Sequence, residues 1–402
     1  MNVVVVGGGL AAAHAAATLR EEGYTGDVTV LAAEPHPPYE RPPLSKGLLL
    51  RTEEPESVLV HDAQWYADHE VALRLGSPAT GLDLDRCRVS VGKQAVPYDR
   101  LLLATGSAPR RLPSADASGA EVVYLRTLDD ALALRDRLQG RVLVVGAGWI
   151  GMEVTAAARQ AGADVTVVEP AAQPLLPVLG PELAPAFASL HREHGVDLRL
   201  GTSVTAFTRT ASGVSATLSD GRSATADLVV VGIGALPADQ LAERAGLATD
   251  HGVLVDARLR TADPHVLAAG DVAQHDHPVL GRLRVEHWDN AIEQGRHAAR
   301  VMLGDDAPYE RLPYFFSDQY DLGMEYVGHV GREGADEVVV RGDLEARVFT
   351  ALWIRAGRVV AGMHANDWDA IGPIREVVGG PAGAPLRDRD LALADAVAAG
   401  QG

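Results

Sequence analysis

Two glycine-rich turns of the same design occur in this chain, Gly7-Gly8-Gly9-Leu10-Ala11-Ala12 near the start and Gly146-Ala147-Gly148-Trp149-Ile150-Gly151 in the middle. Each turn follows a valine-rich run, at residues 3–6 and 142–145, and opens an alanine-rich segment suited to a helix. In such a strand–turn–helix unit the glycines let the backbone approach a pyrophosphate, and the N–H groups at the start of the helix attract the anion. Two copies therefore predict two bound dinucleotides.

An acidic residue closes the second strand of each copy. The strand at 28–31 leads to Glu34, and the strand at 165–168 leads to Glu169. An acid roughly 20 residues beyond the glycines is placed to bind the ribose diol of an adenosine. Glu169 would also oppose a 2′-phosphate, and residues 170–173 contain no basic side chain. The second site is therefore predicted to prefer NADH over NADPH.

The composition excludes several other classes of protein. The 36 Lys and Arg against 54 Asp and Glu give a net charge of −18, which argues against nucleic-acid binding. No apolar run is long enough to span a membrane, and the chain starts directly on a strand-like segment, so we expect a soluble, cytoplasmic protein. The single cysteine, Cys87, in a strand-like segment, excludes an intrachain disulfide and a CxxC pair. The histidines at 191 and 194 and at 275 and 277 lack metal-site spacing, and no metal is expected.

The chain repeats one organisation and then changes. Both copies end in an apolar strand that closes on glycine, at residues 101–106 and 228–234. A Pro-, Arg- and Ser-rich crossover at 109–119 separates them. Beyond about residue 308 the pattern becomes alternating strands, at 346–354 and 359–363, joined by a tight turn at Ala356-Gly357. We expect this last block to be a separate α+β domain.

Several segments carry a resemblance to a known family. Besides the two glycine turns and Glu153, they are Pro38-Tyr39-Glu40-Arg41-Pro42-Pro43-Leu44-Ser45-Lys46, Ala104-Thr105-Gly106, Leu125-Arg126-Thr127-Leu128, Ala269-Gly270-Asp271, Glu286-His287-Trp288-Asp289-Asn290-Ala291 and Phe316-Ser317-Asp318-Gln319-Tyr320. In this order they make almost the whole chain resemble the FAD-containing, NADH-dependent ferredoxin reductases that serve oxygenases and cytochromes P450.

The resemblance implies an α/β fold of the glutathione-reductase type. It would have two Rossmann-like dinucleotide-binding domains and a C-terminal α+β domain. The discontinuous FAD-binding domain would comprise residues 1–109 and 236–308, the NAD-binding domain 110–235, and the C-terminal domain 309–402.

The first glycine turn resembles the family's FAD site. Gly7, Gly9 and Ala11 would meet the pyrophosphate, Ala12 stands where a third glycine often sits, and Glu34 would bind the ribose. Asp271 would accept hydrogen bonds from the ribityl hydroxyls at the end of a strand. The remaining FAD contacts implied by the resemblance are Arg41, Ala79 on the adenine side, Thr105, Gly106 and Arg126.

Three residues are implied as catalytic. The Lys46 ammonium would lie against the flavin and stabilise its reduced, anionic form, with Glu153 as its partner. Trp288 would stand beside the flavin, where an aromatic ring shields it or relays contact to the electron acceptor. The second glycine turn resembles the NAD site, with contacts at Gly146, Gly148, Ile150, Gly151, Glu169, Gly232 and Gly234.

The expected reaction passes a hydride from NADH to FAD and then single electrons to a ferredoxin. We expect exposed arginines, Arg282, Arg284 and Arg311, to hold this acidic partner. Some relatives carry a lysine after the Ser-Asp-Gln-Tyr segment, where this chain has Gly323-Met324-Glu325. That departure weakens the docking argument.

Two alternatives remain at this point. An NADH oxidase or peroxidase of the same fold uses a cysteine near the flavin, and residues 42–45 contain no sulfur. A flavoprotein with mainly an interaction role, of the apoptosis-inducing-factor type, would carry insertions and a basic surface, and this compact acidic chain has neither.

Overall fold

The structure is a computed structural model that describes residues 1–211, 213–331 and 333–400. Its contacts divide the chain into two compact units. Unit 1 comprises Met1–Glu40, Glu56–Ala108 and Leu236–Phe315, and unit 2 comprises Arg41–Pro55, Pro109–Ala235 and the chain from Phe316 onward. No sequence signal anticipates that the short segment Arg41–Pro55 groups with unit 2.

Unit 1 is built on a five-stranded parallel sheet in the order β19-β7-β1-β2-β3. The bounds are β1 Asn2–Val6, β2 Asp27–Leu31, β3 Val71–Arg74, β7 Arg100–Leu103 and β19 Val266–Ala268. The central strands are almost entirely apolar because both faces of a parallel sheet are covered.

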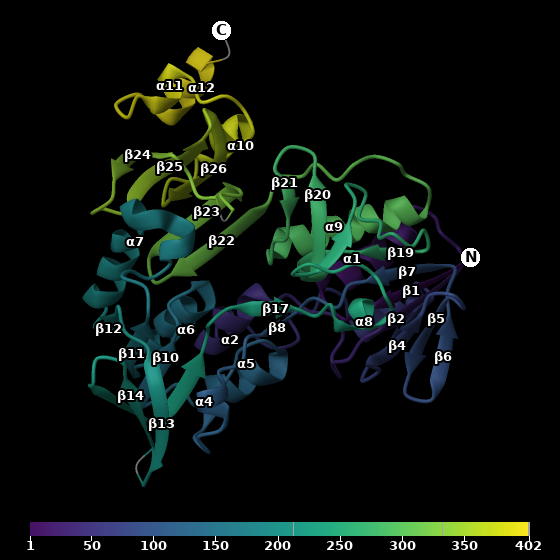
Figure 1. Cartoon of the computed structure of the whole chain (residues 1–402), viewed down its shortest axis with the longest axis horizontal. Helices are drawn as coiled ribbons and strands as arrows, with labels where there is room; N and C mark the ends of the chain where they lie inside the picture. The colour runs from purple at the N-terminus through teal and green to yellow at the C-terminus, as the bar shows by residue number, and fades with distance from the viewer. Residues whose placement is uncertain (212, 332, 401–402) are drawn as a thin grey trace. The chain divides into compact units, whose positions relative to one another are not determined.

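Two helices of unit 1, α1 (Leu10–Glu21) and α9 (Trp288–Met302), pack against each other and lie side by side in Figure 1. They meet at Gly295, where a Cβ atom would come within 2.4 Å of the Ala11 carbonyl oxygen. Glycine at this position therefore sets the close approach of the two helices.

The other elements of unit 1 surround this sheet. Two antiparallel or mixed sheets have the orders β4-β5-β6 and β18-β20-β21. The bounds are α3 Ala63–Asp68, β4 Ala79–Asp83, β5 Arg88–Val91, β6 Gln94–Pro97, α8 Gln240–Arg244, β18 Val253–Val255, η2 Gly270–Val272, β20 Ala273–His277 and β21 Gly281–Leu283. The short strands β8 (Ser107–Pro109) and β17 (Ala235–Pro237) lie where the chain passes from one unit to the other.

Unit 2 repeats the parallel design, with the strand order β12-β11-β10-β16-β9. The bounds are β9 Val122–Val123, β10 Arg141–Val145, α6 Trp149–Gln160, β11 Asp164–Glu169, α7 Leu176–Glu193, β12 Asp197–Leu200 and β16 Leu228–Val231. Helix α7 contains a break at Gly180, where φ is +75°. An antiparallel sheet of β13 Val204–Thr210, β14 Gly213–Leu218 and β15 Ser223–Ala226 follows β12 in the chain. The shorter helices are η1 Pro42–Ser45, α2 Gly47–Leu50, α4 Pro113–Asp116 and α5 Leu128–Arg135.

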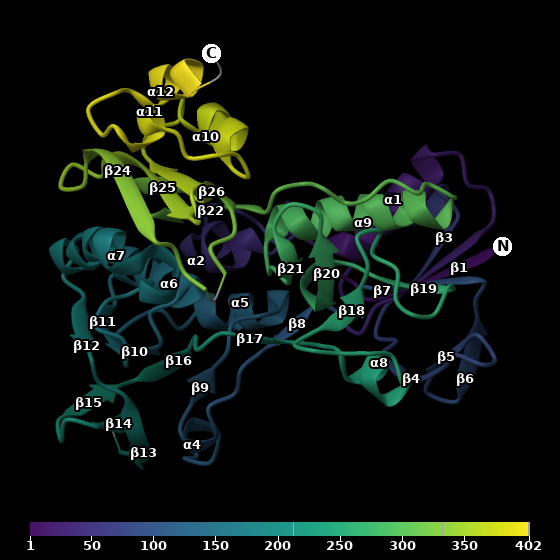
Figure 2. The ribbon, with the colours of Figure 1, turned by 45° about the horizontal axis from the view of Figure 1, so that its top comes forward.

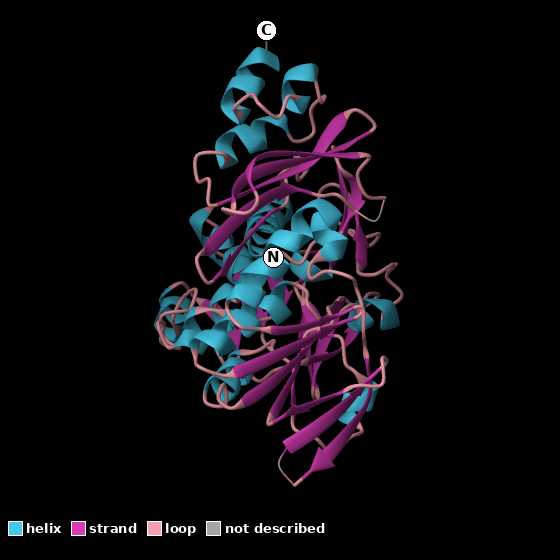
Figure 3. Ribbon diagram, turned by 90° about the vertical axis from the view of Figure 1, so that its left-hand side faces the viewer, coloured by secondary structure: helices cyan, strands magenta, loops and turns pink. Residues whose placement is uncertain are grey.

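The end of the chain forms a five-stranded sheet, in the order β22-β23-β26-β25-β24. The bounds are β22 Tyr314–Gln319, β23 Leu322–Gly328, β24 Glu337–Asp343, β25 Val348–Arg355 and β26 Arg358–Ala365. The predicted turn at Ala356-Gly357 joins β25 to β26 with positive φ at both residues, 48° and 73°. Helices α10 (Ile371–Val377), α11 (Ala384–Arg387) and α12 (Leu393–Gly400) gather beyond this sheet in Figure 2, next to the C-terminal label in Figure 3.

The predicted fold class is confirmed. Two strand–turn–helix units open separate parallel sheets, β1 to α1 and β10 to α6, and an α+β block follows. Across the described part of the chain, helices lack the combination of length and apolarity that crossing a membrane requires.

Candidate functional site

The first glycine turn joins β1 to α1 in unit 1. Gly7 has a φ of +139°, and a Cβ there would lie 2.0 Å from the Ala104 carbonyl oxygen. Gly9 is the N-cap residue of α1, and a Cβ on it would meet no described atom within 4 Å. Ala11 and Ala12 are buried in the first turn of the helix, so they can offer a ligand only their backbone. The backbone N–H groups at this helix start fit the pyrophosphate of a dinucleotide.

The predicted ribose ligand Glu34 lies beyond the end of β2. The buried Tyr39 hydroxyl donates a hydrogen bond to the Glu34 carboxylate. The Gly76 N–H donates to the Glu34 carbonyl at 3.0 Å, which brings the start of β4, and Ala79, toward this end of the sheet. Tyr39 therefore holds the Glu34 carboxylate, a contact that the sequence motif does not reveal.

Asp271 follows β19 in the short helix η2. Its Oδ2 accepts a hydrogen bond from the Ser107 hydroxyl at 2.7 Å. Thr105 is turned toward the fold instead, since its hydroxyl donates to the Ala238 carbonyl at 2.7 Å. Gly106 has a φ of +69° and accepts from the Ala238 N–H at 2.9 Å. The predicted residues at the ends of β7 and β19 are thus brought together, with Ser107 as an unpredicted member.

Trp288 opens helix α9 in unit 1 and is half-buried. Its indole N–H donates a hydrogen bond to the Glu40 carboxylate. Burial raises the pKa of Glu40, and the hydrogen bond from Trp288 lowers it. The indole is therefore held by a carboxylate from the Pro-Tyr-Glu-Arg segment.

The second glycine turn joins β10 to α6 in unit 2, and its glycines have different roles. A Cβ on Gly146, where φ is +101°, would lie 2.3 Å from the Gly232 carbonyl oxygen, and one on Gly151 would lie 2.2 Å from the Gly146 carbonyl oxygen. Gly148 is the N-cap residue of α6, and a Cβ on it would meet no described atom within 4 Å. The first and third glycines permit close packing, while the second leaves the helix start accessible to a phosphate.

The other predicted NAD contacts surround this turn. Ile150 is 47% exposed in the first turn of α6. Gly232 packs close to Gly151, since a Cβ on Gly232 would lie 3.4 Å from the Gly151 Cα atom. Gly234 adopts a positive φ of 97°.

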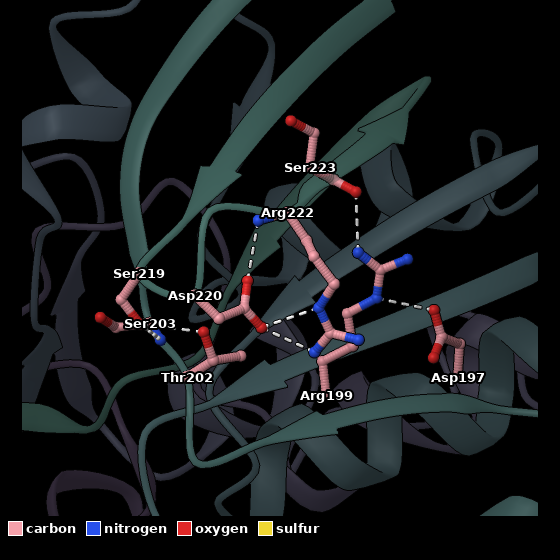
Figure 4. A network of polar contacts seen from close by, with 8 residues as sticks. All are labelled: Asp197, Arg199, Thr202, Ser203, Ser219, Asp220, Arg222 and Ser223. Carbon is pink, nitrogen blue, oxygen red and sulfur yellow. Dashed lines mark hydrogen bonds and ion pairs between the residues drawn. The ribbon is translucent and has the colours of Figure 1, made fainter.

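Glu169 ends β11 with its carboxylate beside the glycine turn. Oε2 accepts a hydrogen bond from the Ala147 N–H at 2.7 Å, and Oε1 accepts from the Ala171 N–H at 2.9 Å. The Glu169 carbonyl accepts from the Thr202 N–H at 3.1 Å. The Thr202 hydroxyl in turn bonds to that of Ser219 at 2.9 Å, within the polar network of Figure 4. This network fixes the loop that supports the end of β11.

Figure 4 shows how the rest of that network is held. Arg199 donates to the Asp197 carboxylate and to the Ser223 carbonyl, each at 2.8 Å. Arg222 pairs with Asp220 at the tip of the next hairpin. Exposed contacts of this kind contribute little stability singly, and their effect here is to order the loops between β12 and β15.

The predicted ion pair between Lys46 and Glu153 is present in unit 2, with the Lys46 Nζ 2.7 Å from Glu153 Oε2. The Glu153 carboxylate is only 5% exposed. It also accepts hydrogen bonds from the Ser45 hydroxyl at 2.5 Å and from the Ser317 hydroxyl at 2.7 Å. The Phe316 ring lies 5.6 Å from Nζ. A buried carboxylate with this many partners holds its ammonium partner in a defined place.

A buried chain of hydrogen bonds continues from this ion pair. Gln319 donates to the Ser317 hydroxyl at 3.2 Å, and its Oε1 lies 2.8 Å from His191 Nε2. Burial lowers the pKa of His191 to about 4, with a smaller opposing effect from Gln319. The sequence indicated that His191 lacks metal-site spacing and predicted no other role for it. Among the described residues, His, Cys, Asp and Glu side chains form no cluster of three or more suited to a metal ion.

The two remaining predicted FAD contacts are adjacent in unit 2. Arg41 donates to the Arg126 carbonyl at 2.5 Å. Arg126 directly precedes Thr127, the N-cap residue of α5, which forms a capping box with Asp130. The Arg126 N–H donates to Asp130 Oδ2 at 3.1 Å, so the cap also fixes the backbone of Arg126.

Of the three arginines expected to be exposed for docking, Arg282 and Arg311 are exposed and Arg284 is not. The Arg284 side chain is only 18% exposed, and it donates to the Asp271 carbonyl and to Glu286 at 2.9 and 2.7 Å. Arg282 is exposed but paired with Asp276 at 2.6 Å. Arg311 makes two hydrogen bonds to the buried Asp289, which raise its pKa. Cys87 is likewise not in a strand, since it occupies the turn between β4 and β5 with a φ of +49°.

Comparisons with known proteins agree with this geometry. The model of the pyridine nucleotide-disulphide oxidoreductase family matches residues 1–295, and that of the reductase C-terminal domain matches residues 314–396. The anthranilate 1,2-dioxygenase system ferredoxin–NAD(+) reductase component of Burkholderia cepacia is 41% identical, with 93% of each chain covered. Rhodocoxin reductase of Rhodococcus erythropolis is 40% identical, over 91% of this chain and 86% of its own.

Solved structures give the same result. The covalent putidaredoxin reductase–putidaredoxin complex contains a chain that matches with a TM-score of 0.95 at 35% identity, over 100% of this chain and 99% of that one. The ferredoxin reductase for the CYP199A2 system from Rhodopseudomonas palustris matches with a TM-score of 0.93 at 34% identity, over 98% and 99% of the two chains. The chain belongs to the pyridine nucleotide-disulphide oxidoreductase family, and within it to the FAD-dependent ferredoxin reductases that serve oxygenases and cytochromes P450.

Proposed function

We propose that this protein takes electrons from NADH and passes them through FAD to a ferredoxin that supplies an oxygenase or a cytochrome P450. The observation that carries the proposal is the pair of glycine turns on separate parallel sheets, each with a carboxylate near the end of the second strand, Glu34 and Glu169. The names of the relatives, a dioxygenase reductase component and a reductase joined to putidaredoxin, support the choice of acceptor.

The first turn would hold FAD. When bound, FAD accepts two electrons as a hydride and gives them up one at a time, which suits a one-electron iron–sulfur acceptor. The N–H groups at the start of α1 would bind its pyrophosphate, Glu34 its ribose and Asp271 its ribityl chain. The Tyr39 and Ser107 hydroxyls hold these two carboxylates in place.

The second turn would hold NADH. Glu169 would accept hydrogen bonds from both ribose hydroxyls while remaining anchored by the Ala147 N–H. The same carboxylate would repel a 2′-phosphate, so NADH is the preferred donor.

Lys46, Glu153 and Trp288 would carry the catalytic roles. The Lys46 ammonium supplies a fixed positive charge that favours the reduced flavin, and Glu153 sets its position. Ser45 and Ser317 orient Glu153 and are positioning residues. Trp288, held by Glu40, would shield the flavin.

The predicted division of the chain and its location belong to the same proposal. Residues 1–109 with 236–308 would form the FAD-binding domain, 110–235 the NAD-binding domain and 309–402 the C-terminal domain. Dependence on NADH supports a cytoplasmic location.

The proposal is tested by NADH-dependent reduction of cytochrome c by the purified flavoprotein, with and without added ferredoxin. We expect flavin absorption bands, rapid reduction that requires the ferredoxin, and slow turnover of oxygen and hydrogen peroxide. A panel of 2Fe–2S, 3Fe–4S and rubredoxin acceptors identifies the class of partner.

The same assay separates the alternatives. Rapid peroxide turnover without a protein partner would indicate an oxidase or peroxidase. Negligible turnover with every acceptor would indicate an interaction protein.

A further inference from the structure

The Gln294 side chain is fully buried on helix α9. Its Oε1 accepts a hydrogen bond from the Gly270 N–H at 2.9 Å. Its Nε2 lies 3.2 Å from Nδ1 of His275, which is 1% exposed on β20. One amide thus bridges the turn that carries Asp271 and a buried imidazole, all within unit 1.

The chemistry of these groups fixes the orientation of the amide. A backbone N–H can only donate, so the Gln294 atom facing Gly270 must be the carbonyl oxygen. The NH₂ group therefore faces His275, and Nδ1 of that ring must accept. It follows that His275 is neutral and carries its proton on Nε2.

Gly270 is the first residue of η2, and its backbone determines where Asp271 points. Its φ is +77°, and a Cβ there would lie 3.3 Å from the Ala11 Cβ atom, so the turn packs directly on α1. Two other contacts hold Asp271, the Ser107 hydroxyl on its carboxylate and the Arg284 guanidinium on its carbonyl. The hydrogen bond from the Gly270 N–H to Gln294 holds the residue that directly precedes Asp271, just beyond the end of β19.

Helix α9 can supply this contact because it lies unusually close to α1. Gly295, adjacent to Gln294, has no side chain, and a Cβ there would come within 2.4 Å of the Ala11 carbonyl oxygen. The helix that carries Gln294 is thereby fixed against the helix that follows the first glycine turn. The geometry therefore joins the two parts of the chain that are expected to bind the pyrophosphate and the ribityl chain of FAD.

We propose that Gln294 is a positioning residue for FAD, which holds the Asp271 turn in its cofactor-binding form, and that His275 keeps the Gln294 amide in the required orientation. This inference rests on the proposed function, because it assigns the Asp271 turn to FAD. Binding of FAD would require one conformation of this turn, and the Gln294 contact favours the conformation seen here. Loss of the Gln294 contact should therefore weaken FAD binding.

Protonation of His275 would undo this arrangement. The protonated ring has no acceptor atom, so Nδ1–H and the Gln294 NH₂ group would face each other as two donors. The amide would then have to rotate, leaving the Gly270 N–H without its acceptor. Acid should release FAD by this route.

Several groups surround the His275 ring. His277 and Asp276 lie on its own strand β20, the Leu283 backbone on β21, His297 on α9 and the Tyr309 ring 5.6 Å away. The pKa of His275 is lowered to about 4, chiefly by burial and also by His277 and His297, while Asp276 and the Leu283 backbone act in the opposite direction. Release by this route should therefore begin as the pH falls toward about 4.

The test compares FAD retention in three variants of the full chain. Gln294→Met keeps the size of the side chain but removes both hydrogen bonds. His275→Asn keeps an acceptor close to the place of Nδ1 and cannot titrate. His297→Asn removes a half-buried histidine of α9 that lowers the pKa of His275, so it serves as a control of opposite sign. Free FAD is measured after ultrafiltration as a function of FAD concentration at pH 7.5 and of pH between 7.5 and 4.

We expect Gln294→Met to raise the FAD dissociation constant about 10-fold at pH 7.5, with the FAD-free protein melting close to the wild-type temperature. His275→Asn should bind FAD nearly as the wild type does at pH 7.5 and retain it to lower pH, whereas His297→Asn should release FAD at the wild-type pH or above it, because His297 lowers the pKa of His275. An unchanged dissociation constant in Gln294→Met overturns the positioning role. A wild-type pH curve in His275→Asn overturns the role of the imidazole, and this variant remains informative if Gln294→Met fails to fold. Wild-type protein that binds no FAD would contradict the proposed function itself.

Discussion

Replacement of Glu169 by glutamine tests the preference for NADH most directly. The carboxylate is fixed at the glycine turn by the N–H groups of Ala147 and Ala171, at 2.7 and 2.9 Å. A ribose bound there with a 2′-phosphate would bring about 1.5 to 2 negative charges within roughly 4 Å of it. Two unit charges at this distance repel by about 1 kcal/mol in water and by more in a less polar site. The repulsion against NADPH is therefore at least about 1.5–2 kcal/mol.

Glutamine removes this charge and keeps the size of the side chain. We expect kcat/KM for NADPH to rise by roughly 10- to 30-fold, which is the repulsion converted to a rate ratio. For NADH a hydrogen bond to a charged group is lost, a change of about 1.5–3 kcal/mol, so kcat/KM should fall at least about 10-fold. The ratio of the two values should then fall at least about 100-fold. Both are measured by steady-state kinetics with ferricyanide as acceptor, so that ferredoxin docking plays no part.

Two controls isolate the charge at this position. Glu169→Asp keeps the charge on a shorter side chain, and its preference for NADH should persist even if KM rises. Asp164→Asn makes the same change in net charge at the opposite end of β11, where the side chain is 88% exposed, and should leave the ratio unchanged. A wild-type ratio in Glu169→Gln would refute the reasoning.

Three further predictions follow from the contacts described. Lys46→Met leaves the Glu153 carboxylate buried without its cation, so it should lower the free energy of unfolding by about 3 kcal/mol. The melting temperature of the FAD-bound protein should fall more than in Glu153→Gln, and equal shifts would contradict this. Stability should decline as the pH falls from about 6.5 to 4, because the buried His191 has a pKa of about 4 in the folded chain and the unfolded chain binds the proton first. The loss is about 3 kcal/mol, and the urea midpoint of His191→Gln should depend less on pH than that of the wild type. Arg282→Glu should raise KM for ferredoxin several-fold without affecting ferricyanide reduction, and an unchanged KM would remove this arginine from the docking surface.

The parallel strands and the glycine turns were predictable because their causes are local. A strand covered on both faces is a short apolar run, and the valines of β1 and β10 are nearly all fully buried. In the second turn, a Cβ atom on the first or the third glycine would lie within 2.3 Å of a carbonyl oxygen, so any chain with this turn needs glycine at both places. The acids Glu34 and Glu169 stand near the ends of the second strands, where the repeat predicted them.

The partners of these residues were much harder to predict. Ser45 and Ser317 both bond to Glu153, from positions 108 and 164 residues away in the chain. The pairing of Lys46 with Glu153 was anticipated only through the resemblance to a family. No periodicity or spacing encodes such contacts, because they depend on how strands and helices far apart in the chain pack together.

The arginines show the same limit most clearly. Arg284 appeared in the sequence as one more surface charge, yet in the fold it is mostly covered and bonds to the Asp271 carbonyl. Gln294 looked like an ordinary polar residue of a helix, yet it is fully buried against the Asp271 turn. The two dinucleotide-binding units follow from the sequence, because local sterics and burial specify a strand, a glycine turn and a helix. The polar side chains that hold the site follow only from the packed fold, because a hydrogen bond or an ion pair exists only where packing brings its two partners within about 3 Å.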